Sequence, residues 1–180
     1  MNRFKTSYDK TIEVIVWLAK KQPGIDVYHA AKVLFYADKM HINKYGRPVT
    51  GDVYIKMPYG PVPSGARDLI TGSAWLSPKQ TDKMKDSLII DKDLNYQLTA
   101  LRPPDTSYLS RSDITCLETS LNKYGHLSFD ELYSLTHAEK CYCQTFSNEK
   151  IDYALFIDDD NPLRDEILDD LSESSEYIQV

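Results

Sequence analysis

Two stretches near the N-terminus carry apolar residues at helical spacing, and they constrain the fold more than any other feature of the chain. Over residues 7–21 the apolar positions spread around most of the helix surface, which predicts a helix covered by its neighbours. Pro23-Gly24 should end it. A second helix should begin after an Asp26 cap, run to about residue 44 and stop at Gly46. The chain therefore predicts a helical core.

The remaining segments are shorter. Residues 51–57 alternate and favour a strand, and Pro58, Gly60, Pro61 and Pro63 should form a stiff loop after it. Further expected elements are a helix from a Ser64 cap to residue 69, a hairpin over 88–98, and helices over 110–124, 128–136 and 162–171. The fold class is mainly α with a small β-sheet or hairpin. We expect one compact helical domain over residues 1–156 and an acidic C-terminal segment, 157–180, with a short amphipathic helix.

The charge of the chain is concentrated in that segment. The chain has 27 acids, 21 strong bases and a net charge of −6, but residues 158–176 alone carry −8 and residues 1–157 carry +2. The net negative charge argues against nucleic-acid binding, but the near-neutral charge of residues 1–157 weakens that argument. The order of helices and hairpin could suggest a winged helix. However, the expected hairpin carries Lys92 as its only base, which is too little positive charge for contacts with phosphates. The segment itself is either a solubilising tail or an arm that covers a basic surface of a partner.

Compartment and metal binding follow from the apolar runs and the cysteines. No apolar run approaches the roughly 20 residues of a membrane span, and no signal region follows the start, so we expect a cytoplasmic protein without membrane contact. The three cysteines fit a reducing compartment. His137, Cys141 and Cys143 have the spacing H-x3-C-x-C, but a zinc site needs a fourth ligand, and reduced, packed cysteines are the default interpretation. We expect no metal and no cofactor.

Asp38 is the most unusual polar position. It lies on the apolar stripe of the second helix, four residues after Leu34, where a lone charge is costly. His41 follows three residues later, within reach on a helix. The pair is either an acid–base pair or a buried polar contact that fixes helix packing, and the second interpretation is favoured. No serine-nucleophile motif, phosphate loop or metalloprotease motif is present.

Tyrosine is abundant. The 13 tyrosines outnumber the two Trp and five Phe together. Tyrosine is enriched in protein interfaces, but it can equally cover a small core.

Residues 34–63, LFYADKMHINKYGRPVTGDVYIKMPYGPVP, closely resemble the signature of the Panacea domain of SocA-like antitoxins. The family pattern has a "YLAD" phrase, a histidine, a "G-x-P-x-T/S-G-D-x-Y" phrase and a "GPV" phrase. This chain supplies its polar positions Asp38, His41 and Asp52. A later "YG…S-x-x-E-L" phrase and an S/T-H pair match Tyr124-Gly125, residues 128–132 and Thr136-His137. The match spans about residues 10–145.

The resemblance implies a non-catalytic bacterial antitoxin, often encoded on a prophage or other mobile element, that neutralises a co-encoded toxin by direct protein contact. Some members instead deliver the toxin to an AAA+ protease, which is the alternative function. A third hypothesis is a hydrolase that uses Asp38 and His41. The resemblance leaves the toxin and the oligomeric state open, including a homo-oligomer.

The motif also gives a candidate binding loop. A loop stiffened by proline and shaped by Gly60 and Pro61 would present Tyr54, Tyr59 and Val62 to a partner at little entropic cost. The alternative is that this loop only supports the second helix.

Overall fold

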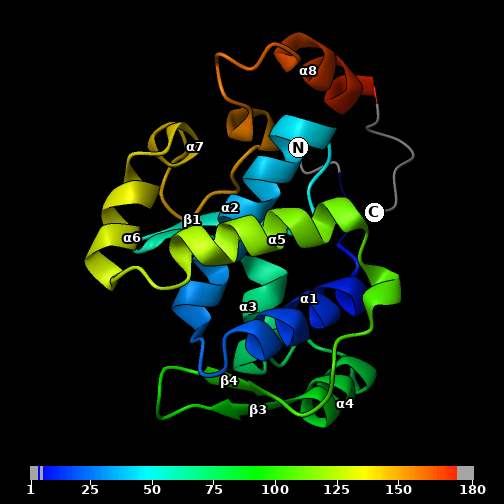
Figure 1. The fold of residues 1–180 in the computed structure, drawn as a ribbon. Coiled ribbons are helices and arrows are strands. Elements are labelled where there is room, and N and C mark those ends of the chain that lie inside the picture. Colours follow the sequence, from blue (N-terminus) through cyan, green and yellow to red (C-terminus); the bar gives the residue numbers. More distant parts are fainter. Residues whose placement is uncertain (1–3, 5, 174–180) are drawn as a thin grey trace.

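The computed structural model describes residue 4 and residues 6–173 of the chain (Figure 1). Its helices are α1 (Tyr8–Lys21), α2 (Val27–Tyr45), α3 (Ser64–Thr71), α4 (Pro78–Ser87), α5 (Arg111–Tyr124), α6 (Phe129–His137), α7 (Lys140–Cys143) and α8 (Arg164–Glu173), with 3₁₀ turns η1 (Thr106–Tyr108) and η2 (Tyr153–Phe156). Its strands are β1 (Tyr54–Met57), β2 (Gly60–Pro63), β3 (Leu88–Asp91) and β4 (Gln97–Ala100). Strands β1 and β2 form one small antiparallel sheet and β3 and β4 another, so the predicted class, mainly α with a small β component, is confirmed.

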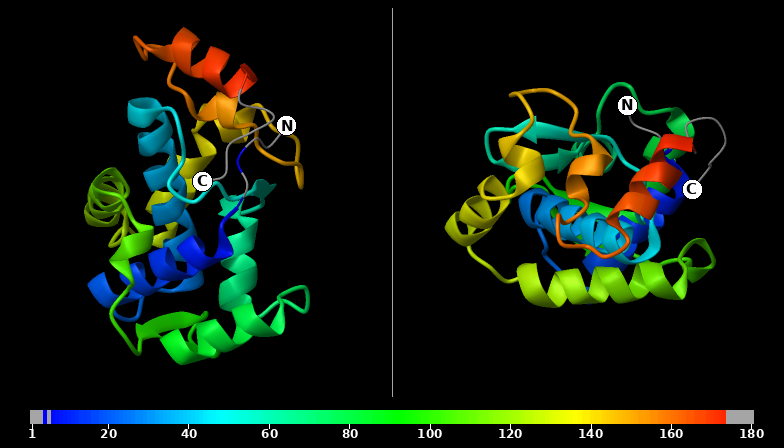
Figure 2. Two further views of the ribbon diagram at one scale, coloured as in Figure 1. Left: turned by 90° about the vertical axis from the view of Figure 1, so that its right-hand side faces the viewer. Right: turned by 90° about the horizontal axis from the view of Figure 1, so that it is seen from above.

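Helix α2 lies at the centre of the molecule. Helix α5 packs across it, and β2, α3 and α8 also contact it (Figures 1 and 2). The predicted caps are confirmed: the Asp26 carboxylate accepts from the His29 amide at 2.8 Å, and Gly46 ends the helix in the left-handed conformation. Nearly every turn of α2 is buried because its apolar positions surround the helix.

Helix α1 confirms the other long prediction. It begins after Ser7, packs against α3, α4 and β4, and is buried from Lys10 to Ala19. The turn between α1 and α2 is held by β4, because the Ile25 carbonyl accepts from the Leu98 amide at 2.9 Å. The β3–β4 hairpin therefore closes the end of the molecule where α1 and α2 meet (Figure 1).

The proline-rich segment was predicted as a loop, which is right for its start and wrong for the rest. Pro58 and Tyr59 form a turn, but residues 60–63 form β2, which pairs with β1 in the register Lys56↔Pro61 and Tyr54↔Pro63. The amide of Lys56 and the carbonyl of Tyr54 bond on the other side of β1, to Glu149 and Ile151. The two prolines therefore lie opposite residues whose backbone groups face away, where a missing N–H costs nothing.

The segment after β2 holds two further differences. Ser64 was predicted as the cap of the third helix, but it is the first residue of α3 and provides no side-chain cap. Helix α4 was not predicted, because its sequence is almost entirely polar and buries only Met84 and Ser87. Its available signal was the capping box formed by Ser77 and Gln80.

The acidic segment packs against the body as far as it is described. Ile167 and Leu171 of α8 are buried with the main core, whereas Leu163, predicted on the same apolar face, is 45% exposed. The Asp158 carboxylate lies 3.0 Å from the Lys39 ammonium on α2. The last acid of the segment, Glu176, lies outside the described residues, and a domain boundary after residue 156 stays a prediction.

None of the described helices combines the length and the apolar character that a membrane span requires.

Gly60 gives the first test of this fold. Its φ is +102°, and a Cβ there would lie 2.6 Å from Thr136 Oγ1 and 2.8 Å from Lys32 Nζ. We expect Gly60→Ala to lower the free energy of unfolding by about 3 kcal/mol, because it combines a strained φ with overpacking. Gly46→Ala is the matched control: its φ is +70° but its Cβ would meet nothing within 4 Å, so it should cost only about 1–2 kcal/mol. Equal losses in urea denaturation would contradict the close packing at Gly60.

Candidate functional site

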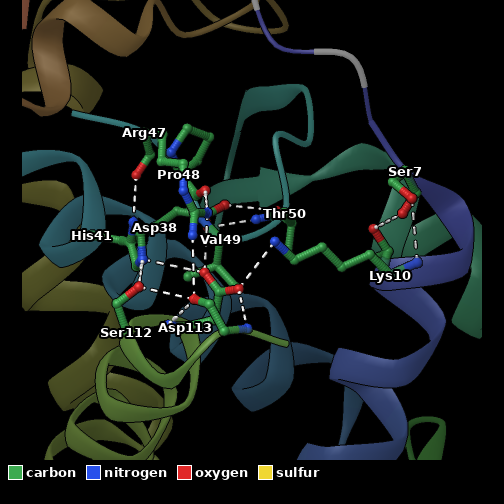
Figure 3. A network of polar contacts seen from close by, with 12 residues as sticks. Ser7, Lys10, Asp38, His41, Arg47, Pro48, Val49, Thr50, Ser112 and Asp113 are labelled. Atoms are coloured by element: carbon green, nitrogen blue, oxygen red, sulfur yellow. Dashed lines mark hydrogen bonds and ion pairs between the residues drawn. The ribbon is translucent and has the colours of Figure 1, made fainter. Parts of the chain in front are cut away.

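Asp38 organises the segment that connects α2 to β1. Its carboxylate accepts hydrogen bonds from the amides of Val49 (2.7 Å) and Thr50 (3.1 Å) and from the hydroxyl of Thr50 (2.7 Å) (Figure 3). It also accepts from the hydroxyl of Tyr54 at 2.9 Å. The side chain is 0% exposed. Burial raises the pKa of Asp38, although the four donors favour the carboxylate. Asp38 thus fixes the entry to the β1–β2 hairpin from within the core.

His41 has other partners than Asp38. Its Nδ1–H donates to the Arg47 carbonyl at 2.7 Å, while Nε2 lies 3.0 Å from Ser112 Oγ and 3.2 Å from Asp113 Oδ1 (Figure 3). The side chain is also buried. Asp38 binds the segment that leads into β1, and His41 binds the Arg47 carbonyl and helix α5. Both side chains are buried and are not arranged as an acid–base pair that reaches a substrate, so the interpretation as packing contacts fits the geometry.

Asp113 completes this network, and sequence reasoning missed it. Its carboxylate lies 3.1 Å from Lys10 Nζ and 3.1 Å from Arg47 Nη1, and accepts from the Ser110 amide at 2.9 Å. Burial raises its pKa, but the hydrogen bonds from His41 and Ser110 and the charges of Lys10 and Arg47 outweigh this and hold the pKa well below its usual range. The signal that could have found it is the capping box from Ser110 to Asp113.

Asp52 fixes the exit from the same hairpin. Its carboxylate accepts from the amides of Gly65 (2.8 Å) and Ala66 (2.7 Å), the first turn of α3, and from its neighbour Val53 (2.7 Å). It therefore caps α3 from a distance, in place of the predicted Ser64. Burial raises the pKa of Asp52 and the hydrogen bonds from these amides lower it, and the net result is a pKa of about 6.

His137 holds the turn of the hairpin. Its Nε2 lies 3.1 Å from the Pro58 carbonyl oxygen, and its ring stacks on Tyr133 with centroids 3.6 Å apart. Asp38, Asp52 and His137 therefore position the entry, the exit and the turn of one hairpin.

The cysteines near His137 do not converge on a metal. Cys141 is buried, and the exposed Cys143 donates its S–H to the His137 carbonyl at 3.2 Å. Within residues 6–173, no group of three or more His, Cys, Asp or Glu side chains is arranged to hold a metal ion.

The five predicted partner-binding residues fall into two groups. Tyr59 is 60% exposed and Val62 is partly exposed, whereas Tyr54 is 1% exposed and Gly60 and Pro61 are buried. The prediction that the hairpin presents Tyr54 on its surface is therefore wrong: its hydroxyl is committed to Asp38. Contact of Tyr59 and Val62 with a partner stays a prediction.

A pocket of about 400 Å³ lies between α2 and the hairpin. Tyr28 and Lys32 of α2, Tyr59 and Val62 of the hairpin, and Arg67 of α3 line it, with mostly apolar neighbours.

Lys32 is the buried cation of this site. It is 0% exposed, its ammonium donates to the Pro61 carbonyl at 2.9 Å, and it lies 5.0 Å from the centroid of the Tyr28 ring. Burial lowers its pKa to about 7. Lys32 forms no ion pair with a carboxylate of residues 6–173, so the desolvation of its charged form is not offset by an ion pair.

Aromatic side chains extend from the pocket across α6. Tyr28 and Tyr59 contact Phe129 with ring centroids 4.7 and 5.5 Å away, and Phe129 lies 6.1 Å from Tyr133. Tyr59, Phe129 and Tyr133 are 60%, 43% and 38% exposed. We call Tyr28, Tyr59, Phe129 and Tyr133 the aromatic surface. Sequence reasoning identified Tyr59 but not the others, because they come together only in the fold.

Comparison with known proteins gives one match. A family model described as "Antitoxin SocA-like, Panacea domain" matches residues 31–142. This span contains Asp38, His41, Asp52, His137 and the aromatic surface except Tyr28. No curated protein and no solved structure is matched.

Asp38 can be tested by two substitutions. In Asp38→Ala, the amides of Val49 and Thr50 and two hydroxyls lose their buried acceptor, so we expect a loss of at least about 3 kcal/mol in the free energy of unfolding. Asp38→Asn keeps an acceptor oxygen and the side-chain volume, and the hydroxyls can turn to accept, so it should cost about half as much. Urea denaturation of both variants measures this. A loss below about 1 kcal/mol in Asp38→Ala would contradict the role described.

Lys32 predicts a pH dependence of stability. Its pKa is about 7 in the folded protein against 10.5 ordinarily, so between these values the unfolded chain binds more protons. The free energy of unfolding should therefore rise with pH above 7, by up to about 1.4 kcal/mol per pH unit from this group. Lys32→Met removes the group, so the variant's advantage over the wild type should be largest at pH 6 and shrink toward pH 9.

Urea denaturation at several pH values checks this, with Lys85→Met as the control at an exposed lysine. Parallel curves for the wild type and Lys32→Met would show that Lys32 does not titrate in this range.

Proposed function

The chain belongs to the family of SocA-like antitoxins with a Panacea domain, and on that premise we propose that it neutralises a co-encoded toxin by binding it directly. In this proposal the toxin gene lies beside the gene for this chain, on a bacterial prophage or other mobile element, and neutralisation involves no chemical step by this protein.

The observation that carries this proposal is the division between buried and exposed motif residues. Asp38, His41 and Asp52 are 0–1% exposed, and their polar atoms bind backbone and core groups. They support a scaffold and are not placed to act on a substrate. What the scaffold holds outward is Tyr59, next to Phe129.

The aromatic surface has the features of a protein interface. Aromatic side chains are enriched in interface cores and often dominate their binding energy. Tyr59 lies in a two-residue connection between paired strands, and the turn is held by His137 at Pro58. A partner would therefore meet Tyr59 in a fixed position, which reduces the entropy lost on binding.

Co-expression tests the proposal. The product of the neighbouring gene should stop bacterial growth when made alone, and the wild-type chain should restore it. The double variant Tyr59→Asp, Phe129→Asp should lower the number of surviving colonies at least tenfold, because two charges would be desolvated at the interface. Trp75→Asp is the matched control, since Trp75 is 93% exposed and lies between α3 and α4.

Thermal unfolding of each variant must show that it is folded. A neighbouring product that is harmless, or toxic but not countered by the wild type, would contradict the proposal. A toxin half-life that is unchanged by the wild-type chain supports neutralisation by binding, whereas a shortened half-life would favour delivery to an AAA+ protease instead.

A further inference from the structure

The pocket beside the hairpin combines apolar walls with positive charge. Tyr28, Tyr59, Val62 and Met57 contribute apolar surface, and the cavity of about 400 Å³ lies within the range of roughly 300–1,000 Å³ typical of ligand sites. Of the ten lining residues, two are cations, Lys32 and Arg67, and none is Asp or Glu.

Neither cation is neutralised by the described part of the chain. The ammonium of Lys32 has one hydrogen-bond acceptor there, the Pro61 carbonyl, although it carries three donors. Arg67 is exposed on α3 and forms no ion pair with residues 6–173. Because Lys32 is buried, the charge of its protonated form acts through the pocket wall in a medium of low effective dielectric, while Arg67 can contact an anion directly.

We propose that this pocket receives a segment of the toxin in which a large apolar side chain lies next to an Asp or Glu carboxylate. The apolar side chain packs between Tyr28, Tyr59 and Val62, and the carboxylate pairs with Arg67 within the field of Lys32. This proposal rests on the proposed function, since it names the chemistry of the partner at the same surface.

The surroundings favour a protein segment over a polyanion. Two carboxylates, Asp26 and Asp130, interact electrostatically with Tyr28 at the side of the pocket. Burial raises the pKa of Tyr28 to about 12, and the negative charges of the two carboxylates add to this rise. A nucleic acid or an anionic membrane would bring many phosphates toward these acids, with only two cations to meet them. A single carboxylate on an apolar segment matches two cations in an apolar pocket.

The chemistry of the pocket can be measured without the toxin. We expect 3-phenylpropionate to bind the full chain at least fivefold more tightly than 3-phenylpropanamide, as followed by amide chemical shifts near Tyr59 and Val62. Arg67→Gln should reduce this preference to nearly one, and Lys32→Met should reduce it in part. Val62→Trp should fill the pocket and abolish binding of both probes, whereas Lys85→Gln on α4 should change nothing. Equal binding of acid and amide to the wild type, or shifts elsewhere, would overturn the proposal.

The growth assay then separates this inference from the proposed function. Arg67→Glu and Val62→Trp should each lower rescue at least tenfold, and Arg67→Lys should keep most of it. If the wild type rescues growth and these variants rescue equally well, the pocket does not hold the toxin although the function stands. If the wild type fails to rescue, the function is wrong, and a probe preference would show only the pocket's chemistry. A dimer that Val62→Trp abolishes in sedimentation would identify a second copy as the occupant and overturn the proposal.

Discussion

The four hydrogen bonds accepted by Asp38 are the contact on which the rest of the site depends. A carboxylate within the core is costly unless its oxygens are satisfied, and here the satisfying groups are two consecutive amides and two hydroxyls of the segment that leads into β1. The burial of Asp38 is therefore tied to one conformation of residues 49–54. That conformation places β1, whose partner strand β2 packs against α2 and whose turn carries Tyr59. Asp52 then uses the same logic at the next junction, where its carboxylate sets the start of α3.

The sequence allowed prediction of those parts of the fold that are determined locally. Helices α1, α2, α5 and α6 carry both an apolar period and a cap, and each was predicted within a few residues. Helix α4 escaped because a polar helix leaves no periodic signal. Strand β2 escaped because its prolines are tolerated only through the register with β1, where Pro61 faces Lys56, a residue whose amide bonds elsewhere. Register is a property of two segments together, and no pattern within one segment reveals it.

The site shows the same limit. Asp38 and His41 were identifiable because a carboxylate on an apolar stripe is anomalous in itself, but their partners were not, and the helical spacing suggested a contact between them that the fold does not use. Asp113 and Lys32 are ordinary residues in the sequence. They become significant only when α5 and β2 fold against α2 and remove them from water, Asp113 beside the cations Lys10 and Arg47 and Lys32 with a single carbonyl. The difference between these two buried charges is electrostatic, one compensated and one not, and it is invisible without the fold.

The burial of the motif's polar residues also bears on the proposed binding of a toxin. The polar residues of the motif are used inside the molecule, so they can maintain the hairpin whatever lies outside it. In the proposed function, affinity for the toxin comes from exposed groups, and beside the hairpin these include Tyr59, Phe129 and Arg67, which forms no ion pair with residues 6–173. Substitutions there change the outer surface without touching the hydrogen bonds of Asp38 or Asp52. A scaffold whose motif carboxylates are satisfied from within can therefore change its outer surface without losing its fold.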